Sequence, residues 1–167
     1  TVTGAGTYTG SFRFLLTITS ATLGLQVDGD TVVTYNTTDQ KPGKDKLIVT
    51  VGGNTLTEDQ FTVRYLDHDG NEVDEFKNAG SYTIEVSAEN HEPATMSFVV
   101  QRADLSEAQV VQGPSGTYVY NGKAHKPEIK MNEEVTQSGY SVTYGTNTKV
   151  GWGVVTVEAS DRGNYYG

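Results

Sequence analysis

The amino-acid sequence predicts an all-β protein built from antiparallel β-sandwiches. Composition is the first reason: the 167 residues include 23 Thr, 20 Val and 10 Tyr but only 8 Leu and 9 Ala, and β-branched and aromatic residues favour strands. The second reason is that apolar and polar residues alternate in short segments, which is the period of a strand with one buried face. Turns rich in glycine, asparagine and aspartate separate these segments.

The first predicted strand covers residues 11–19, in which Phe12, Phe14, Leu16 and Ile18 share one face. The same alternation predicts strands around residues 47–51, 61–66, 73–76, 82–86, 94–100, 140–144 and 155–157. Turns are predicted at Asp28-Gly29, Gly52-Gly53, Asp69-Gly70, Asn121-Gly122 and Gly163-Asn164. Only residues 105–111 are compatible with a short helical turn. Short strands with regular turns and no long helix indicate antiparallel sandwiches.

The sequence also repeats itself. Tyr35-Asn36 recurs 85 positions later as Tyr120-Asn121, and Lys41-Pro42 recurs at the same distance as Lys126-Pro127. Residues 61–65 and 79–86 resemble residues 140–144 and 150–157, in the same order. Matches that keep their order along the chain are the signature of tandem repeats.

We therefore expect three parts. Residues 1–21 are predicted to be the end of a preceding, truncated repeat, residues 22–103 a complete sandwich repeat, and residues 104–167 a repeat that lacks its last strand. The repeats are expected to be linked at residues 21–23 and 102–105.

Three phrases resemble the recurring signatures of a known family. They are Asn78-Ala79-Gly80-Ser81-Tyr82-Thr83-Ile84, Tyr118-Val119-Tyr120-Asn121-Gly122-Lys123 and Gly163-Asn164-Tyr165-Tyr166-Gly167. In pieces, they are similar to bacterial Ig-like (MBG-type) tandem repeats of Gram-positive cell-surface proteins. The resemblance implies tandem Ig-like antiparallel β-sandwich repeats, usually without catalysis, in the stalk or adhesin segment of a secreted protein anchored in the cell wall.

Charge and composition exclude several classes of function. A net charge of −9 repels phosphate backbones and anionic membranes, and no apolar run approaches the roughly 18 residues of a membrane span. We therefore expect neither nucleic-acid binding nor membrane insertion. Because the chain has no cysteine, structural disulfides, thiolate metal sites and a cysteine nucleophile are excluded.

No motif for nucleophilic, phosphoryl-transfer or dinucleotide chemistry is present. Acidic pairs such as Glu133-Glu134 are adjacent in sequence, so in a strand their carboxylates point to opposite faces and cannot flank a sugar. We predict that the chain is not an enzyme and uses no cofactor.

Asp67, Asp69 and Asn71 form a weak candidate metal site, because a hard cation such as calcium binds several oxygen ligands from one loop. The spacing does not fit an EF-hand. The alternative is a plain hairpin, in which the Asp69-Gly70-Asn71 turn supplies the positive φ angles. His68, His91 and His125 lack metal-site spacing and are predicted to lie on the surface.

Trp152 is the candidate ligand contact. It lies out of phase with the apolar positions Val155 and Val157, so it is either a cap over the end of the sandwich or an exposed contact. In the second case Trp152 and nearby tyrosines could stack on a glycan or bind a host surface protein.

The expected absence of a last strand in the second repeat leaves an open sheet edge, which is a template for another strand. Phe12, Phe14, Leu16 and Ile18 would then belong to a strand without a sheet of its own. We expect this strand to complete the sheet of a neighbouring molecule, head to tail; the alternative is that both ends fray.

The sequence is thus interpreted as a non-catalytic, extracellular cell-surface repeat module that acts as stalk, spacer and adhesin segment. Its expected partners are neighbouring repeats of the same protein. The alternative is a carbohydrate- or host-protein-binding β-sandwich, which could be accessory to a secreted glycosidase.

Overall fold

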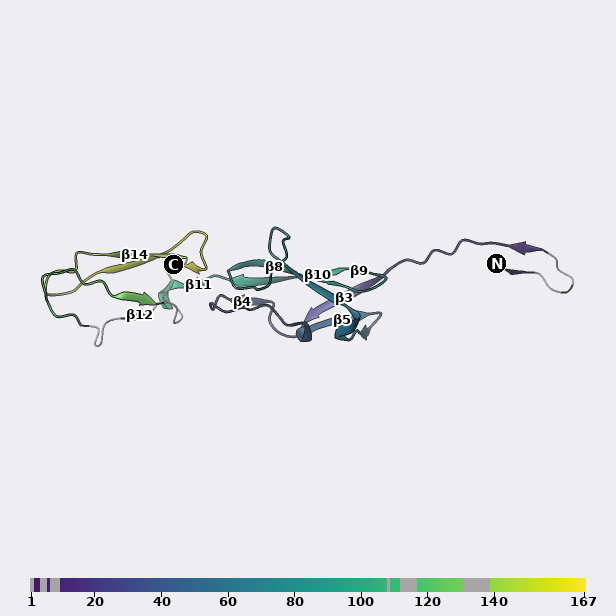
Figure 1. Ribbon diagram of the computed structural model, residues 1–167, viewed down its shortest axis with the longest axis horizontal. Coiled ribbons are helices and arrows are strands. Elements are labelled where there is room, and N and C mark those ends of the chain that lie inside the picture. The colour runs from purple at the N-terminus through teal and green to yellow at the C-terminus, as the bar shows by residue number, and fades with distance from the viewer. Residues whose placement is uncertain (1, 4–5, 7–9, 108, 112–116, 131–138) are drawn as a thin grey trace.

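The computed structural model describes residues 2–3, 6, 10–107, 109–111, 117–130 and 139–167. Regular elements among these residues are strands and three short 3-10 helices, so the predicted all-β class is confirmed. Figure 1 shows an elongated molecule with two bodies in series and an extended N-terminal segment at one end. We call the body that contains β3 to β10 the first unit, and the body that contains β11 to β16 the second unit.

The first unit consists of two four-stranded sheets. One has the order β4-β10-β8-β7 and comprises β4 (Val32–Thr34), β7 (Thr62–Leu66), β8 (Gly80–Ser87) and β10 (Ala94–Gln101). The other has the order β6-β5-β3-β9 and comprises β3 (Ala21–Val27), β5 (Leu47–Val51), β6 (Asn54–Thr55) and β9 (His91–Glu92). Two 3-10 helices are present: η1 (Lys44–Lys46) precedes β5, and η2 (Glu58–Gln60) precedes β7.

Most strand pairs are antiparallel, as predicted, but two edge pairs are not. β4 pairs with β10 in parallel, and β3 pairs with β9 in parallel. For these two pairs the antiparallel prediction is wrong, because the chain crosses between the two sheets before each pair forms. Crossovers of this kind join the sheets into one sandwich-like body.

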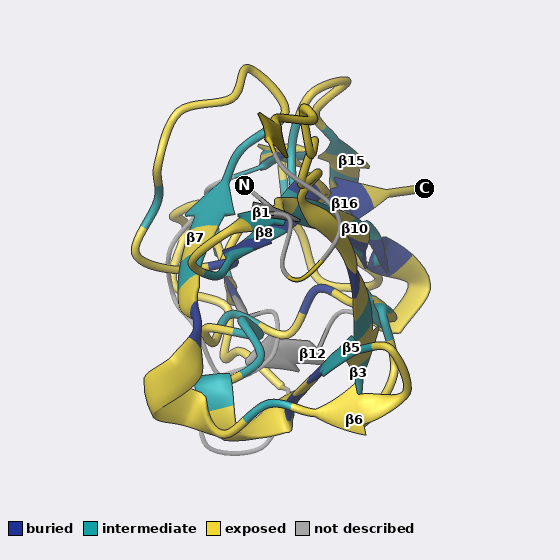
Figure 2. Cartoon of the chain, turned by 90° about the vertical axis from the view of Figure 1, so that its right-hand side faces the viewer, coloured by how far each residue is buried: buried dark blue, intermediate teal, exposed yellow. Residues whose placement is uncertain are grey.

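The two sheets of the first unit share one apolar core. Val49 of one sheet and Ile84 of the other are fully buried, and Phe98 is 2% exposed. Figure 2, viewed along the long axis, shows buried residues on strands of both sheets. The predicted alternation in β5, β8 and β10 is therefore confirmed, since the apolar residues of each strand face this core.

Phe76 is at the centre of this core, although it belongs to no strand. Its ring stacks on Tyr82 at 4.2 Å between centroids and also contacts Tyr65 and Phe98. The backbone N–H of Phe76 donates a hydrogen bond of 2.7 Å to Asp39. The predicted strand at 73–76 is wrong, because the chain leaves the sheet edge there to insert this ring.

The second unit has three two-stranded sheets among the described residues. Antiparallel pairs join β12 (Gln109–Val111) to β13 (Glu128–Lys130) and β14 (Tyr140–Tyr144) to β15 (Val155–Ala159). A parallel pair joins β11 (Ala103–Asp104) to β16 (Tyr165–Tyr166). The predicted helical turn between 105 and 111 is limited to the 3-10 helix η3 (Leu105–Glu107).

The two units share a set of contacts. Val63 pairs with Val86 in the β7–β8 hairpin, as Val142 pairs with Val157 in the β14–β15 hairpin. The Tyr65 hydroxyl donates to the carbonyl of Pro42 at 2.7 Å, and the Tyr144 hydroxyl donates to the carbonyl of Pro127 at the same distance. In both units a lysine ammonium lies over the tyrosine ring.

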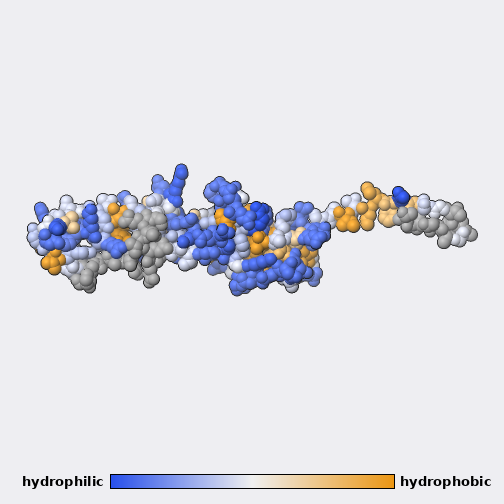
Figure 3. All heavy atoms as spheres, in the orientation of Figure 1, coloured by the Kyte–Doolittle hydropathy of each residue, from blue (hydrophilic) through white to orange (hydrophobic). Residues whose placement is uncertain are grey.

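The N-terminal segment differs from its prediction. Only β1 (Val2–Thr3) and β2 (Ser11–Phe12) form a short hairpin, and the chain after Phe12 is extended without a partner strand as far as β3. Phe12, Phe14, Leu16 and Ile18 are 60–86% exposed, and Figure 3 shows apolar atoms along this segment. The expectation of a buried face is therefore wrong for the single chain, because no second layer lies against these residues.

The residues expected to link the repeats belong to strands or lie directly beside them. Residues 21–23 begin β3, and Leu23 is 5% exposed. Arg102 leads directly into β11, and Ala103 and Leu105 are buried. No helix among the described residues is long and apolar enough to cross a membrane.

Candidate functional site

Trp152 is fully exposed, with a relative exposure of 102%. It lies in the connection between β14 and β15, at the end of the molecule opposite the N-terminal segment (Figure 1). Other large apolar residues are exposed as well, both in this connection and in the segment that leads into β13. They are Tyr118, Val119, Tyr120, Val150 and Val154. Of the two positions considered for Trp152, the structure therefore favours the exposed contact. A group of exposed apolar residues of this kind is typical of an interaction surface.

A cleft of about 710 Å³ opens beside Trp152. Its walls include Tyr118, Tyr120, His125 and Pro127 from the segment before β13, and residues 147–153 from the connection between β14 and β15. The Tyr118 and His125 rings are 4.8 Å apart between centroids. We call this space the Trp152 cleft; its volume is within the range of small-molecule sites.

Asn147 holds the two sides of the cleft together. Its side-chain Nδ2 donates to the carbonyl oxygens of His125 and Val154, and its Oδ1 accepts the Val154 N–H at 2.8 Å. Gly153 allows this approach, since a Cβ at that position would lie 2.8 Å from the Asn147 Oδ1. The loop that carries Trp152 is therefore fixed at its base.

The Trp152 cleft occupies the place that aromatic rings fill in the first unit. Gln40 donates its N–H to the carbonyl of Phe76, and in the second unit His125 donates its N–H to the carbonyl of Asn147. Asn147 thus has the backbone position of Phe76 but no ring to bury. By hairpin register, Gly153 stands where Tyr82 stands in β8. Asn147 and Gly153 carry no ring, and both line the cleft.

The cleft offers stacking surfaces together with polar side chains, among them Thr148 and Lys149. The Nε2 atom of His125 is buried and has no hydrogen-bond partner in the described part of the chain. The prediction that His125 is a plain surface side chain is therefore wrong, since its ring lines the cleft and is half-buried. Exposed aromatic faces beside polar side chains are suited to binding.

The acidic turn is organised as a hairpin turn. The Asp67 carboxylate accepts the backbone N–H groups of Asp69 and Asn71, both at 2.9 Å. Hydrogen bonds from the backbone and side chain of Asn71 hold the pKa of Asp67 below its usual range. Gly70 has a φ of 84°, as the turn requires. Within the described residues, no three histidine or acidic side chains come together in an arrangement that could hold a metal ion.

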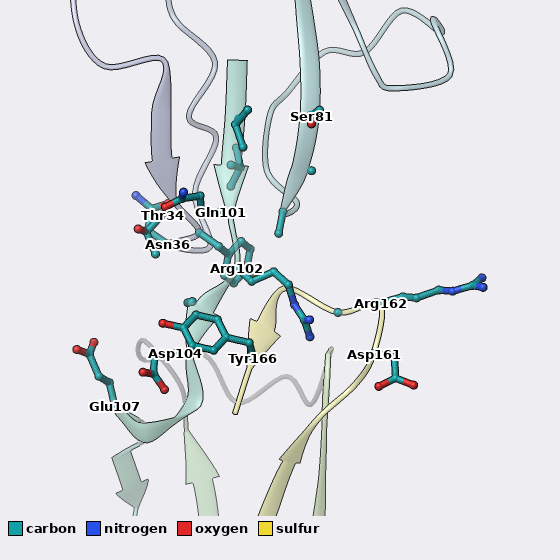
Figure 4. Close-up of a pocket in the computed structure, with 17 residues that line it drawn as sticks. Thr34, Asn36, Ser81, Gln101, Arg102, Asp104, Glu107, Asp161, Arg162 and Tyr166 are labelled. Atoms are coloured by element: carbon teal, nitrogen blue, oxygen red, sulfur yellow. The ribbon is translucent and has the colours of Figure 1, made fainter. Parts of the chain in front are cut away.

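A second cleft, of about 1180 Å³, lies where the units meet. We call it the junction cleft. Figure 4 shows that its lining side chains come from both units and carry both signs of charge, including Arg102, Asp104, Asp161 and Arg162. Hydrogen bonds from the backbone and side chain of Ser106 lower the pKa of Asp104. Mixed charge on an open surface favours solvation over a selective anion or cation site.

Asn164 connects the units beside this cleft. Its Oδ1 accepts the Ala79 N–H at 2.8 Å, its Nδ2 donates to Asn78, and its backbone carbonyl accepts the Ala103 N–H at 2.9 Å. Arg102 adds a hydrogen bond from its guanidinium to the carbonyl of Ser160. The two units are thus joined by side-chain and backbone bonds at one point.

Buried aromatic rings support the same junction. Tyr165 is 2% exposed, and its ring meets Tyr35 of the first unit edge to face at 5.3 Å. On the other side it meets Tyr140 at 5.8 Å. The three rings link the core of the first unit to that of the second.

Sequence reasoning singled out Trp152 but not its surroundings. Asn147 and His125 are separated from each other by 22 positions, and no pattern in the sequence indicates that they share a cleft. Asn164 was placed in a turn, not at a junction. The one available signal is the closing phrase Gly163-Asn164-Tyr165-Tyr166-Gly167, which carries part of the family resemblance.

Protein-family models, curated proteins and solved structures were compared with this chain, and none of them matches it.

Proposed function

We propose that this chain is a pair of tandem Ig-like β-sandwich repeats that acts as a spacer in an extracellular cell-surface protein. The shared contacts of the two units support a tandem arrangement, above all the two identical Tyr–Pro hydrogen bonds. The order of the sequence matches supports it as well. A spacer needs no catalytic group, but its units must keep a fixed orientation relative to each other.

The observation that carries this proposal is the Asn164 junction. Its three hydrogen bonds reach the first unit at Asn78 and Ala79 and the start of β11 at Ala103. Domains that share only a flexible linker move freely relative to each other. A junction with both polar bonds and buried rings limits that movement and transmits force along the chain.

We expect Asn164→Ala to loosen the junction without unfolding either unit. Cysteines introduced at Asp30 and Lys123, both exposed, allow spin labels to report the distance between the units, and the chain has no other cysteine. The distance distribution should be narrow in the parent protein and clearly broader in Asn164→Ala. Circular dichroism should show the same strand content for both.

Asn54→Ala is the matched control, because Asn54 is an exposed asparagine in β6, away from the junction. It should leave the distance distribution narrow. A parent protein with a broad distribution, or an Asn164→Ala variant as narrow as the parent, would contradict the rigid spacer.

A second candidate function is glycan binding at Trp152. The observation that favours it is the exposed Trp152 ring beside the cleft, with Tyr118 and Tyr120 on the opposite connection. Aromatic faces stack on the apolar faces of sugars, and polar lining residues such as Thr148 and Lys149 can hydrogen-bond to sugar hydroxyls. This function is compatible with a spacer, since adhesive and spacing roles occur in one module.

For this candidate we expect Trp152→Ala to lose glycan-array signals that the parent protein gives. Loss of a central aromatic contact typically costs about 2 kcal/mol of binding free energy or more, which is more than a tenfold change in affinity. Tyr166→Ala serves as the control, because Tyr166 is exposed but lines the junction cleft. If only Tyr166→Ala lost the glycan-array signal, the binding site would lie at the junction cleft. If the parent protein gave no signal at all, glycan binding at Trp152 would be ruled out.

A further inference from the structure

The turn at Asn121 and Gly122 lies on the surface of the second unit, next to the Trp152 cleft. Both residues are exposed, and Tyr120, which precedes them, lines the cleft. The Oδ1 atom of Asn121 accepts the backbone N–H of Lys123 at 2.9 Å. In the described part of the chain, neither the Nδ2 of Asn121 nor the N–H of Gly122 donates a hydrogen bond. No such bond there therefore holds these two nitrogen atoms in place.

The first unit contains the same turn with a different second residue. The Oδ1 atom of Asn36 accepts the backbone N–H of Thr38 at 3.0 Å, and Thr37 has a φ of 73°, against 75° for Gly122. The two turns thus share their backbone geometry and differ in the residue after the asparagine. Asn121 is the only asparagine of the sequence that a glycine follows.

An asparagine side chain in such a turn can react with the backbone nitrogen of the next residue. Negative charge develops on Oδ1 when a nucleophile adds to the side-chain carbonyl carbon, and the N–H of Lys123 lies where it stabilises that charge. The Gly122 nitrogen must then reach this carbon, which depends on backbone freedom. Glycine has that freedom, whereas the β-branched side chain of Thr37 crowds its own nitrogen and restricts the backbone.

Asn147 and Asn164 are held in a different way. The Oδ1 and Nδ2 atoms of both side chains are hydrogen-bonded, at the base of the Trp152 cleft and at the junction respectively. Their carbonyl carbons cannot turn towards the next backbone nitrogen without loss of these bonds. Exposure, few hydrogen bonds and the following glycine therefore distinguish Asn121 from them.

We propose that Asn121 is a site of spontaneous deamidation. The Gly122 nitrogen attacks the side-chain carbonyl carbon, its proton passes to the departing amide nitrogen, and ammonia leaves, so that a cyclic imide remains. Water then adds to either imide carbonyl and breaks its C–N bond. Attack at the side-chain carbonyl gives aspartate, and attack at the main-chain carbonyl gives isoaspartate, in which the backbone runs through the side chain.

Either product changes the wall of the Trp152 cleft. A carboxylate replaces a neutral amide directly after Tyr120, in a chain that already carries a net charge of −9. Isoaspartate also adds a methylene group to the backbone, so the turn cannot keep its present geometry. The reaction needs no enzyme, and the proposal rests on this turn and not on the spacer or the glycan-binding role.

Mass spectrometry of the full chain, incubated for weeks at mildly alkaline pH, tests the proposal. Tryptic digestion gives residues 103–123, in which Asn121 is the one asparagine, and residues 14–44, in which Asn36 is the one asparagine, since Lys41 precedes proline and is not cleaved. The first peptide should gain the mass that replacement of an amide by a carboxyl gives. It should separate into an aspartate form and an isoaspartate form, while the second peptide stays largely unchanged.

Exchanging the residue after the asparagine between the two turns gives matched variants. Gly122→Thr should slow the deamidation of Asn121 about tenfold or more, which is about 1.4 kcal/mol in activation free energy. A Cβ at Gly122 meets no atom within 4 Å, and the first unit has a threonine at the same φ. Thr37→Gly should accelerate the deamidation of Asn36. Circular dichroism should show the strand content of the parent protein for both variants.

The proposal fails if the peptide with Asn121 stays unchanged, or if Asn121 and Asn36 react at equal rates. It also fails if Gly122→Thr reacts as fast as the parent protein. Aspartate without isoaspartate would contradict attack by the Gly122 nitrogen, because direct hydrolysis of the side chain by water gives aspartate alone.

Discussion

Phe76→Ala is expected to unfold the first unit under conditions in which the parent protein is stable. Phe76 is fully buried and contacts three aromatic rings. Truncating a buried phenylalanine typically costs about 3–5 kcal/mol, because transfer free energy is lost and a cavity remains. Since a domain is stabilised by only about 5–15 kcal/mol, this one change removes a large part of the margin.

Urea unfolding followed by far-ultraviolet circular dichroism measures this loss. Thermal unfolding should agree, with a midpoint lowered by about 4–8 °C for each kcal/mol in a unit of this size. Phe14→Ala is the control, because Phe14 is a phenylalanine that is 65% exposed; its effect should be close to zero in the monomer. A loss below about 1 kcal/mol for Phe76→Ala would contradict the central position of this ring.

Tyr165→Ala is expected to destabilise the second unit and to separate it from the first. Tyr165 is 2% exposed and contacts Tyr35 across the junction and Tyr140 within its own unit. We expect a loss of about 3–5 kcal/mol, as for other large buried aromatic residues. Among the described residues the second unit has fewer buried apolar side chains than the first, so we expect it to unfold first.

Calorimetry distinguishes this result from a local effect. The parent protein should unfold in one transition, or in two that overlap, because the junction couples the units. Tyr165→Ala should show two separate transitions, the lower one from the second unit. Tyr166→Ala, at the neighbouring and half-exposed position, should change the profile little; equal effects from both variants would indicate that burial at the junction is not the cause.

The strands that the sequence predicted best are those with a regular buried face. In β8 and β10 every second residue enters the core, so the period of two is visible without coordinates. β3 was missed, since its start at Ala21 was interpreted as a link. The alternation was nevertheless present, since Leu23, Leu25 and Val27 stand at every second position.

Phe76 shows a different limit. It follows Asp74 and Glu75 and precedes Lys77, and a lone ring in a charged segment reads as a surface residue. The Asp39 carboxylate, 37 positions away, and the N–H of Gln40 hold its backbone so that the ring enters the core. A contact over that distance leaves no periodic trace in the sequence.

The candidate binding site divides in the same way. Trp152 could be selected from its phase, because it stands out of step with Val155 and Val157. The cleft beside it could not, since it depends on Asn147 taking the backbone position that Phe76 has in the first unit. The similar backbone bonds of Asn147 and Phe76 can be seen only in the folded chain.

The sequence by itself determined the all-β class, the order of the main strands and the turns. Each of these depends on neighbours along the chain, and alternation or turn chemistry records such neighbours directly. Tertiary structure alone decided the junction at Asn164 and the Trp152 cleft. These depend on groups brought together from distant positions, and packing in three dimensions, not local preference, determines which of them meet.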